Sequence, residues 1–136
     1  MGQREVDIVR GVYASHEVRD TPGLLDLLDD DVEWAQAEGH PYAGPGPWRG
    51  HDEVTRHVVT PINEDWDGFI TRVDEIIDAG DRVIVTGHYT GTYKATGRSI
   101  DASVCAIYTL RDGKIVRFHQ FCDTAQIRAA MGYSLS

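Results

Sequence analysis

The sequence predicts an α+β fold in which helices lie on one face of a curved antiparallel sheet. Segments with helical periodicity gather in the first half of the chain and strand-like segments in the second half, an order typical of this class. The last third holds three apolar or alternating runs joined by short turns, Arg82–Tyr93, Arg98–Leu110 and Lys114–Cys122. At 136 residues, the chain is expected to form a single domain over residues 1–136.

The first half of the chain predicts three helices and a short strand. Apolar residues recur at helical spacing near the N-terminus, and Thr21 followed by Pro22 marks the start of a second, shorter helix. Residues 38–48 are rich in proline and glycine and predict a loop, and the helix that follows is expected to end before Pro61. The predicted helices are Gln3–Val18, Gly23–Leu28 and His51–Thr60, and the predicted strand is Val32–Ala35.

Two turns set the expected register of the sheet. The Asp-Gly pair at 112–113 is typical of a two-residue hairpin turn, and residues 94–97 predict a four-residue loop. The alternation also predicts a fourth strand at Phe69–Ile77, and a capping box at Asp123 predicts a last helix at Ile127–Met131. The expected cross-strand partners are Ile107 with Phe118, Cys105 with Gln120, and His88 with Ser103.

This register divides the sheet into two faces, because successive side chains of a strand point to opposite sides. The more apolar face carries Val104, Tyr108 and Phe121, and since no helix is left to cover it, a homodimer through this outer face is expected. The other face combines polar groups with an apolar wall, as a small-molecule pocket does. Its predicted residues are Thr86, His88, Thr90, Asp101, Ser103, Cys105, Ile107, Phe118, Gln120 and Cys122.

Composition and charge exclude several classes of partner. A net charge of −9 argues against a nucleic-acid-binding surface, and no segment has the apolar length of a membrane span or signal sequence. Two cysteines without a secretory signal predict the reducing cytoplasm. No pair among the six histidines has the helical i, i+4 spacing of a metal site, and residues 44–47 lack the strand and helix of a phosphate-binding loop. Neither a metal nor a cofactor is therefore predicted.

His88 is the first candidate for acid–base chemistry. In the expected register it faces Ser103 and lies within diagonal reach of Asp101. A neutral imidazole oriented by a carboxylate is a common general base near neutral pH, whereas a wall histidine bonded to a hydroxyl is the alternative. With Gln120 on the neighbouring strand, the predicted catalytic residues are His88, Asp101 and Gln120.

The remaining candidates would form the wall that binds the ligand. Aromatic side chains suit a flat or hydrophobic ligand, although core packing explains some of them equally well. The loop at 38–48 is either a lid over the pocket or an ordinary connection. The two cysteines are better explained as small buried hydrophobes than as nucleophiles. The predicted ligand-binding residues are Tyr13, Trp34, Tyr42, Val58, Ser103, Cys105, Ile107, Phe118 and Cys122.

Several short motifs, in their order along the chain, resemble the nuclear transport factor 2-like superfamily and its SnoaL-like and ketosteroid isomerase-like branch. The matching segments are Leu28-Asp29-Asp30-Asp31-Val32-Glu33-Trp34, Trp48-Arg49-Gly50, Gly80-Asp81-Arg82-Val83, Gly91-Thr92, Thr96-Gly97-Arg98, Asp112-Gly113-Lys114-Ile115 and Asp123-Thr124-Ala125. The resemblance implies a cone-shaped barrel in which helices close one side of the sheet over a pocket, and an outer sheet face that often forms dimers.

The resemblance also implies which catalytic groups this chain lacks. Trp34 and Cys105 occupy the positions of the two catalytic carboxyl groups of ketosteroid isomerases, and Gln120 replaces an aspartate of the limonene-epoxide hydrolases. In SnoaL-like polyketide cyclases an acidic residue acts near the end of the last strand. Asp123 is the nearest candidate for that role, and helix capping accounts for it equally well.

Taken together, these features predict a small-molecule-binding SnoaL-like protein. Its expected activity is cofactor-independent acid–base catalysis, of the isomerase, cyclase or hydratase type, on a hydrophobic carbonyl-containing substrate. A non-catalytic carrier or sensor that uses the same pocket is the alternative. A protein-interaction module is the third hypothesis, which the polar groups of the concave face disfavour.

Overall fold

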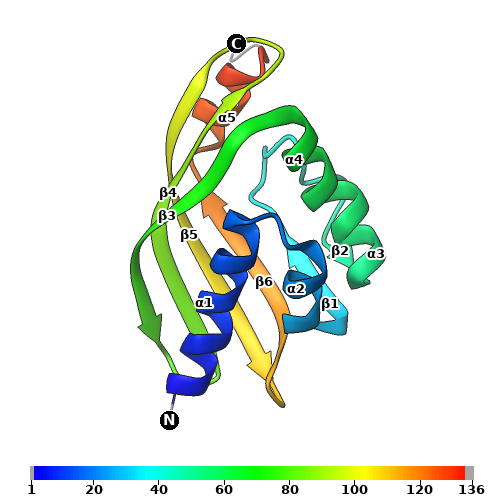
Figure 1. Ribbon diagram of the computed structural model, residues 1–136, viewed down its shortest axis with the longest axis vertical. Helices are drawn as coiled ribbons and strands as arrows, with labels where there is room; N and C mark the ends of the chain where they lie inside the picture. Colours follow the sequence, from blue (N-terminus) through cyan, green and yellow to red (C-terminus); the bar gives the residue numbers. More distant parts are fainter. Residues whose placement is uncertain (1, 134–136) are drawn as a thin grey trace.

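The computed structural model describes residues 2–133 and confirms the α+β class, with helices packed on the concave face of a curved sheet (Figure 1). The helical segments are α1 (Gln3–Glu17), α2 (Thr21–Leu27), α3 (Gly50–Val54), the π-helical turn η1 (Thr55–Val59), α4 (Thr60–Asp65) and α5 (Thr124–Ala130). The strands are β1 (Leu28–Ala35), β2 (Trp48–Arg49), β3 (Trp66–Asp78), β4 (Arg82–Tyr93), β5 (Ser99–Arg111) and β6 (Lys114–Cys122). Within the described residues, no helix has the length and apolar character needed to cross a membrane.

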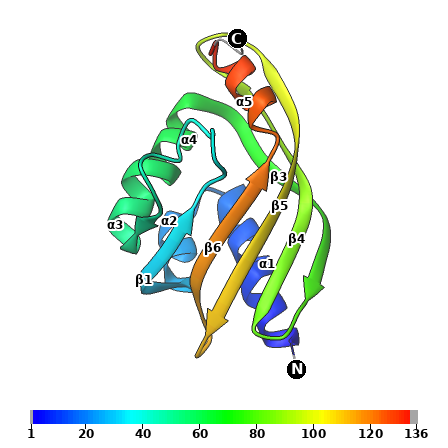
Figure 2. The same ribbon diagram turned by 180° about the vertical axis from the view of Figure 1, so that it is seen from behind.

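The sheet has the strand order β2-β1-β6-β5-β4-β3, so the predicted meander β3–β6 makes up most of it (Figure 2). Neighbouring strands are antiparallel except for β1 and β6, which run parallel, with Trp34 beside Phe118. The prediction of a wholly antiparallel sheet is therefore wrong at this pair. The long connection from β1 to β6 through the helices allows a parallel arrangement, which a tight hairpin would not.

The two turns that anchor the register form as predicted. Asp112 and Gly113 have φ values of 53° and 77°, as a type I′ turn requires, and Arg111 pairs with Lys114. The loop at 94–97 places Thr92 opposite Ser99, so His88 lies opposite Ser103 and Thr86 opposite Cys105. The predicted register between β4 and β5 is thus confirmed.

A β-bulge next to the Asp-Gly turn changes the register between β5 and β6. Leu110 pairs with Ile115, but Thr109 pairs with Arg117, which leaves Val116 as an extra residue in β6. Beyond the bulge, Phe118 lies opposite Tyr108 instead of Ile107. A shift of one residue moves every later side chain to the other face. The predicted pocket face therefore combined residues of β4 and β5 with residues of β6 that lie on the opposite side of the sheet.

The helices cover the face that carries Tyr89, Tyr108 and Phe118. This concave set also includes Val83, Val85, Ala102, Val104, Ala106, Gln120 and Cys122. The convex set includes Thr86, His88, Thr90, Asp101, Ser103, Cys105, Ile107, His119 and Phe121. Val104 and Tyr108 are consequently buried under the helices, so they cannot form the predicted outer patch, whereas Phe121 is 49% exposed on the convex side.

The third helical region runs through Pro61 instead of ending before it. The π-helical turn η1 ends two residues before Pro61, and α4 continues to Asp65. Proline lacks the N–H for an i→i−4 bond, and its ring crowds the carbonyl one turn earlier, so a wider turn at this point lets the helix continue. The same turn brings Val58 and Val59 into the buried interior.

Candidate functional site

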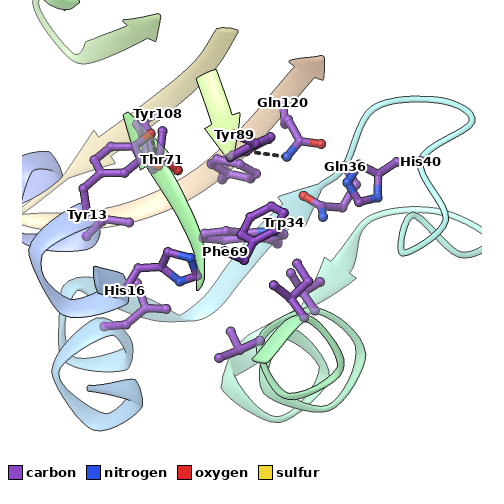
Figure 3. A pocket seen from close by; sticks show the side chains of 16 residues that line it. Tyr13, His16, Trp34, Gln36, His40, Phe69, Thr71, Tyr89, Tyr108 and Gln120 are labelled. Atoms are coloured by element: carbon purple, nitrogen blue, oxygen red, sulfur yellow. Dashed lines mark hydrogen bonds between the residues drawn. The ribbon is translucent and has the colours of Figure 1, made fainter. Parts of the chain in front are cut away.

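A largely apolar pocket lies between the helices and the concave face of the sheet (Figure 3). It encloses about 70 Å³, less than the roughly 300–1,000 Å³ of many ligand pockets. Among the residues that the structure describes, no Asp, Glu, Lys or Arg lines it. The lining residues are Val12, Tyr13, His16, Leu24, Trp34, Gln36, His40, Val58, Val59, Ile62, Phe69, Thr71, Tyr89, Tyr108, Phe118 and Gln120.

Trp34 enters the pocket wall from strand β1. Its indole stacks on Phe118 of the adjacent parallel strand, with ring centroids 3.9 Å apart and planes inclined by 20°. Trp34 is only 7% exposed, and its Nε1–H finds no hydrogen-bond acceptor within residues 2–133. Leaving a buried donor unpaired costs about 1–3 kcal/mol, so a ligand oxygen that accepts this bond would offset a real penalty.

His40 lies in the loop that follows β1, and it is 5% exposed. Burial lowers the pKa of His40 to about 4, so the ring is neutral at physiological pH. The Tyr42 backbone N–H donates to Nδ1 of His40 at 3.1 Å. A neutral imidazole has one N–H and one acceptor nitrogen, so the proton of His40 resides on Nε2.

His16 is the last member of the pocket-facing stripe of α1, after Val12 and Tyr13. Burial lowers the pKa of His16, a hydrogen bond with the Phe69 backbone opposes this effect, and the positive charge of Arg19 adds to it. The ring also packs edge-on against Phe69, with centroids 6.0 Å apart. His16 therefore provides a second neutral imidazole, from the opposite side of the pocket to His40 (Figure 3).

Two hydrogen-bonded pairs position tyrosine hydroxyls in the wall. Tyr108 donates to the Tyr13 hydroxyl at 2.8 Å, and the Gln120 side-chain amide donates to the Tyr89 hydroxyl at 2.6 Å. Gln120 Oε1 accepts the Ala37 backbone N–H at 3.2 Å, which fixes the orientation of the amide. Burial raises the pKa of Tyr13 to about 12 and that of Tyr89 well above its usual range, so both hydroxyls stay protonated. Each accepts one bond and keeps its own proton available to a ligand.

The loop between β1 and β2 is fastened over one end of the pocket by Tyr42. The Tyr42 hydroxyl donates to Asp65 at 2.8 Å and accepts from Trp66 Nε1 at 3.2 Å, at the junction of α4 and β3. Trp48 Nε1 donates to the Tyr42 carbonyl at 3.0 Å, and the Trp48 ring stacks on His57 at 3.9 Å. The predicted aromatic wall residue Tyr42 thus holds the loop in place and does not line the pocket.

A second, open groove of about 510 Å³ runs between α1 and β3. Its walls include Tyr13 and Thr71, which also line the pocket, so these two side chains separate the two spaces. The groove carries charged groups, Arg10, Glu17 and Asp74, whereas the pocket carries none among the described residues. Displacement of Tyr13 would join the groove to the pocket.

The structure brings five predicted site residues together in the pocket and leaves the others outside it. Tyr13, Trp34, Val58, Phe118 and Gln120 line the pocket. Cys122 contacts Gln120, with Sγ and Oε1 3.5 Å apart, but is not a lining residue. Asp123 accepts the Gln126 backbone N–H at 3.2 Å as the cap of α5. The placement of His88, Asp101, Ser103, Cys105 and Ile107 in the pocket is wrong, because the bulge at Val116 puts them on the convex face.

His88 does lie beside Asp101, as its role as an oriented base required. Nδ1 of His88 and Oδ1 of Asp101 are 2.8 Å apart, and Nε2 lies 3.7 Å from Asp74 Oδ2. Both aspartates are at least half exposed, so the pair belongs to a solvated surface cluster that also includes Arg72. A solvent-exposed polar contact of this kind contributes little to stability.

Sequence reasoning missed both pocket histidines as chemical groups. His16 carried a usable signal, because a polar ring follows Val9, Val12 and Tyr13 on the buried stripe of a helix. His40 lies in an irregular loop, where no periodicity indicates which way a side chain points. Tyr108 was predicted on the outer face of the sheet because the bulge at Val116 was not foreseen, and this is also why His88 was predicted in the pocket.

Comparison with known proteins finds one matching family model and several solved structures with the same fold. The model of the SnoaL-like domain matches residues 9–118. An NTF2-like protein from Burkholderia thailandensis is 37% identical, with a TM-score of 0.86 over 93% of this chain and 95% of its own. TerC, crystallised with polyporic acid, is 26% identical, with a TM-score of 0.84 over 96% and 99% of the two chains. IdmH from Streptomyces antibioticus, a proposed polyketide cyclase, shares the fold at 22% identity, with a TM-score of 0.79 over 96% and 99%. No curated protein matches this chain.

Proposed function

This chain belongs to the SnoaL-like domain family, and from that premise we propose that it binds a small hydrophobic, carbonyl-containing compound in the concave pocket and transforms it by acid–base chemistry without a cofactor. The reaction would be an isomerisation, cyclisation or hydration. The proposal rests on one observation above all. The pocket is uncharged across its described lining and rich in hydrogen-bond donors, while two neutral histidines reach into it.

The donors support an oxygen-bearing ligand. Tyr13, Tyr89, His40 and Trp34 each keep a proton that the protein does not use within the site. Donors in a low-dielectric cavity favour a carbonyl or enolate oxygen over a cation, and a largely apolar wall favours an aromatic or aliphatic body. TerC was crystallised with polyporic acid, which supports an aromatic ligand of this general kind for the present chain as well.

A carrier or sensor is the second candidate, and a specific feature favours it. The carboxylates that serve as catalytic acids and bases in related branches have no counterpart in the described pocket wall. A pocket without them can hold a carbonyl compound and leave it unchanged.

Calorimetric titration with phenylacetone, a small aromatic ketone, tests the proposed binding. We expect saturable binding that Val58→Phe weakens at least about tenfold, because the larger ring would fill a pocket of about 70 Å³. Thr90→Phe, on the convex face, is the matched control and should bind like the wild type. Absence of binding, or an equal loss in both variants, would contradict the proposal. Proton NMR of the bound ketone over time then separates an enzyme from a carrier.

A further inference from the structure

The two pocket histidines differ in what they can offer a ligand, because only the acceptor nitrogen of His40 is already occupied. The lone pair on Nδ1 of His40 is taken by the Tyr42 backbone N–H at 3.1 Å. The single proton of the neutral ring therefore sits on Nε2, and His40 can offer a ligand a hydrogen bond but no lone pair. To accept a proton, His40 would have to break its bond with Tyr42 inside a buried loop. His40 can therefore act toward a ligand only as a hydrogen-bond donor.

His16 has the opposite capacity. Its ring lines the pocket and packs edge-on against Phe69, with ring centroids 6.0 Å apart, and within residues 2–133 no hydrogen bond is donated to either ring nitrogen. A neutral imidazole has one acceptor nitrogen, so His16 keeps its lone pair. Since His16 lines the pocket, this nitrogen is the one described group of the wall, apart from amide and hydroxyl oxygens, that can accept a proton.

Trp34 gives independent support for an oxygen near the donor side. Its indole N–H is buried in the pocket wall and has no acceptor within residues 2–133. Figure 3 shows Trp34 between His16 and His40. A ligand whose oxygen satisfies Trp34 or His40 would thus present its body toward the side of the pocket from which His16 enters.

We propose that His16 is the general base of the site and that His40, assisted by Trp34, stabilises the oxyanion, for a ketone with an acidic C–H next to its carbonyl. This inference rests on the proposed function. The C–H bond breaks, and its proton bonds to the free ring nitrogen of His16, which becomes an imidazolium. The electron pair of that bond forms the C=C bond of the enolate, and the carbonyl π pair moves to the oxygen that accepts from His40 Nε2–H. Return of the proton to the same carbon restores the ketone and neutral His16; in a β,γ-unsaturated ketone, return to the γ-carbon of the extended enolate gives the conjugated isomer.

The assignment of His40 is testable without any substrate, by heteronuclear NMR of the histidine ring nitrogens. We expect a neutral Nε2–H tautomer for His40 from neutral pH to well below the ordinary pKa of histidine. An Nδ1–H tautomer or a charged ring at neutral pH in the wild type would overturn the donor role.

The separate roles of His16 as base and His40 as oxyanion donor are tested with phenylacetone in deuterium oxide. Proton NMR follows the loss of the signals of the hydrogens next to the carbonyl. The wild type should accelerate the exchange above the buffer rate. His16→Gln and His40→Leu should each slow it by about 10²-fold or more, while their affinity for phenylacetone stays within about tenfold of the wild type. His88→Gln is the matched control, because His88 lies on the convex face, and it should exchange at the wild-type rate.

The outcomes separate this inference from the proposed function. If phenylacetone does not bind, the proposed function fails in its stated ligand class. If it binds but the wild type does not exchange its hydrogens, binding stands and the base role of His16 is overturned. If exchange occurs and either pocket variant retains the full rate, the role of that histidine is overturned.

Discussion

Gln120 on β6 donates a hydrogen bond of 2.6 Å to the Tyr89 hydroxyl on β4, across the intervening strand β5. The same amide accepts the Ala37 backbone N–H at 3.2 Å. Gln120 is 2% exposed, so one buried side chain ties the loop after β1 to a tyrosine in the middle of the sheet. The Gln120 amide therefore fixes the positions of the Tyr89 hydroxyl and of the Ala37 backbone in the pocket wall.

We therefore expect Gln120→Leu to destabilise the protein. The substitution leaves the Ala37 N–H without its buried acceptor and the Tyr89 hydroxyl without its donor, and an unpaired buried polar group costs about 1–3 kcal/mol. Chemical denaturation measures the free energy of unfolding, with Ser103→Leu on the exposed convex strand as the control. An unfolding free energy equal to that of the wild type would show that Gln120 does not order the wall.

Tyr13 is expected to control the size of ligand that the protein accepts. Tyr13→Ala removes the ring that separates the pocket of about 70 Å³ from the groove of about 510 Å³. The variant should bind naphthylacetone at least about tenfold more tightly relative to phenylacetone than the wild type does, because burial of each further CH₂-sized group is worth about 0.8 kcal/mol. Calorimetry of both ketones gives the ratio. Tyr13→Phe keeps the ring and should keep the wild-type ratio, and a shift of the same size in this variant would mean that the hydroxyl, not the partition, sets the selectivity.

Stability should fall as the solution is acidified through the histidine range. The folded pKa of His40 is lowered from 6.5 to about 4, so between these values the unfolded chain binds more protons than the folded one. The stabilisation is complete above about pH 6.5 and is lost as the pH approaches about 4, with an upper limit of about 3 kcal/mol. Burial of His16 acts in the same direction. Thermal melts across this range should show a smaller pH dependence in His40→Gln than in the wild type, and identical slopes would contradict the burial of His40.

We also propose that two copies of the chain associate through the convex face. Phe121 is 49% exposed there, beside His119 at a ring distance of 4.4 Å, and Ile107, Ile84 and Ile77 follow in one row across the strands. An apolar row of this kind on a sheet face is typical of an interaction site. Phe121→Glu should convert a dimer to a monomer in sedimentation experiments at micromolar concentration. A wild type that sediments as a monomer would rule the proposal out.

Local chemistry accounts for what the sequence could predict. The Asp-Gly turn, the loop at 94–97 and the cap at Asp123 each act over a few residues, and each forms as expected. The bulge at Val116 has no comparable signature, because Lys114–Cys122 reads as a regular strand whether or not one residue is unpaired. That single residue decided which of His88 and Tyr89 faces the pocket.

Two further features could not be predicted from the sequence for another reason. They are the helix that continues through Pro61 and the burial of His40 in its loop. Proline predicts an end because a regular α-helix cannot contain it without losing a hydrogen bond, and the π-helical turn that accommodates it depends on packing against the core. His40 is buried in a loop that Tyr42 fastens to Asp65 and Trp66, which lie more than twenty residues away. Tertiary contacts of this kind leave no local pattern.

The ligand is proposed to occupy the concave pocket between His16 and His40. Titration of the protein with phenylacetone, followed through the histidine ring signals by NMR, tests it most directly. We expect the signals of His16 and His40 to shift in a saturable manner, while those of His88 stay unchanged, because the sheet lies between His88 and the pocket. A saturable shift of His88 with no change at His16 and His40 would place the ligand on the convex face and contradict binding in the concave pocket.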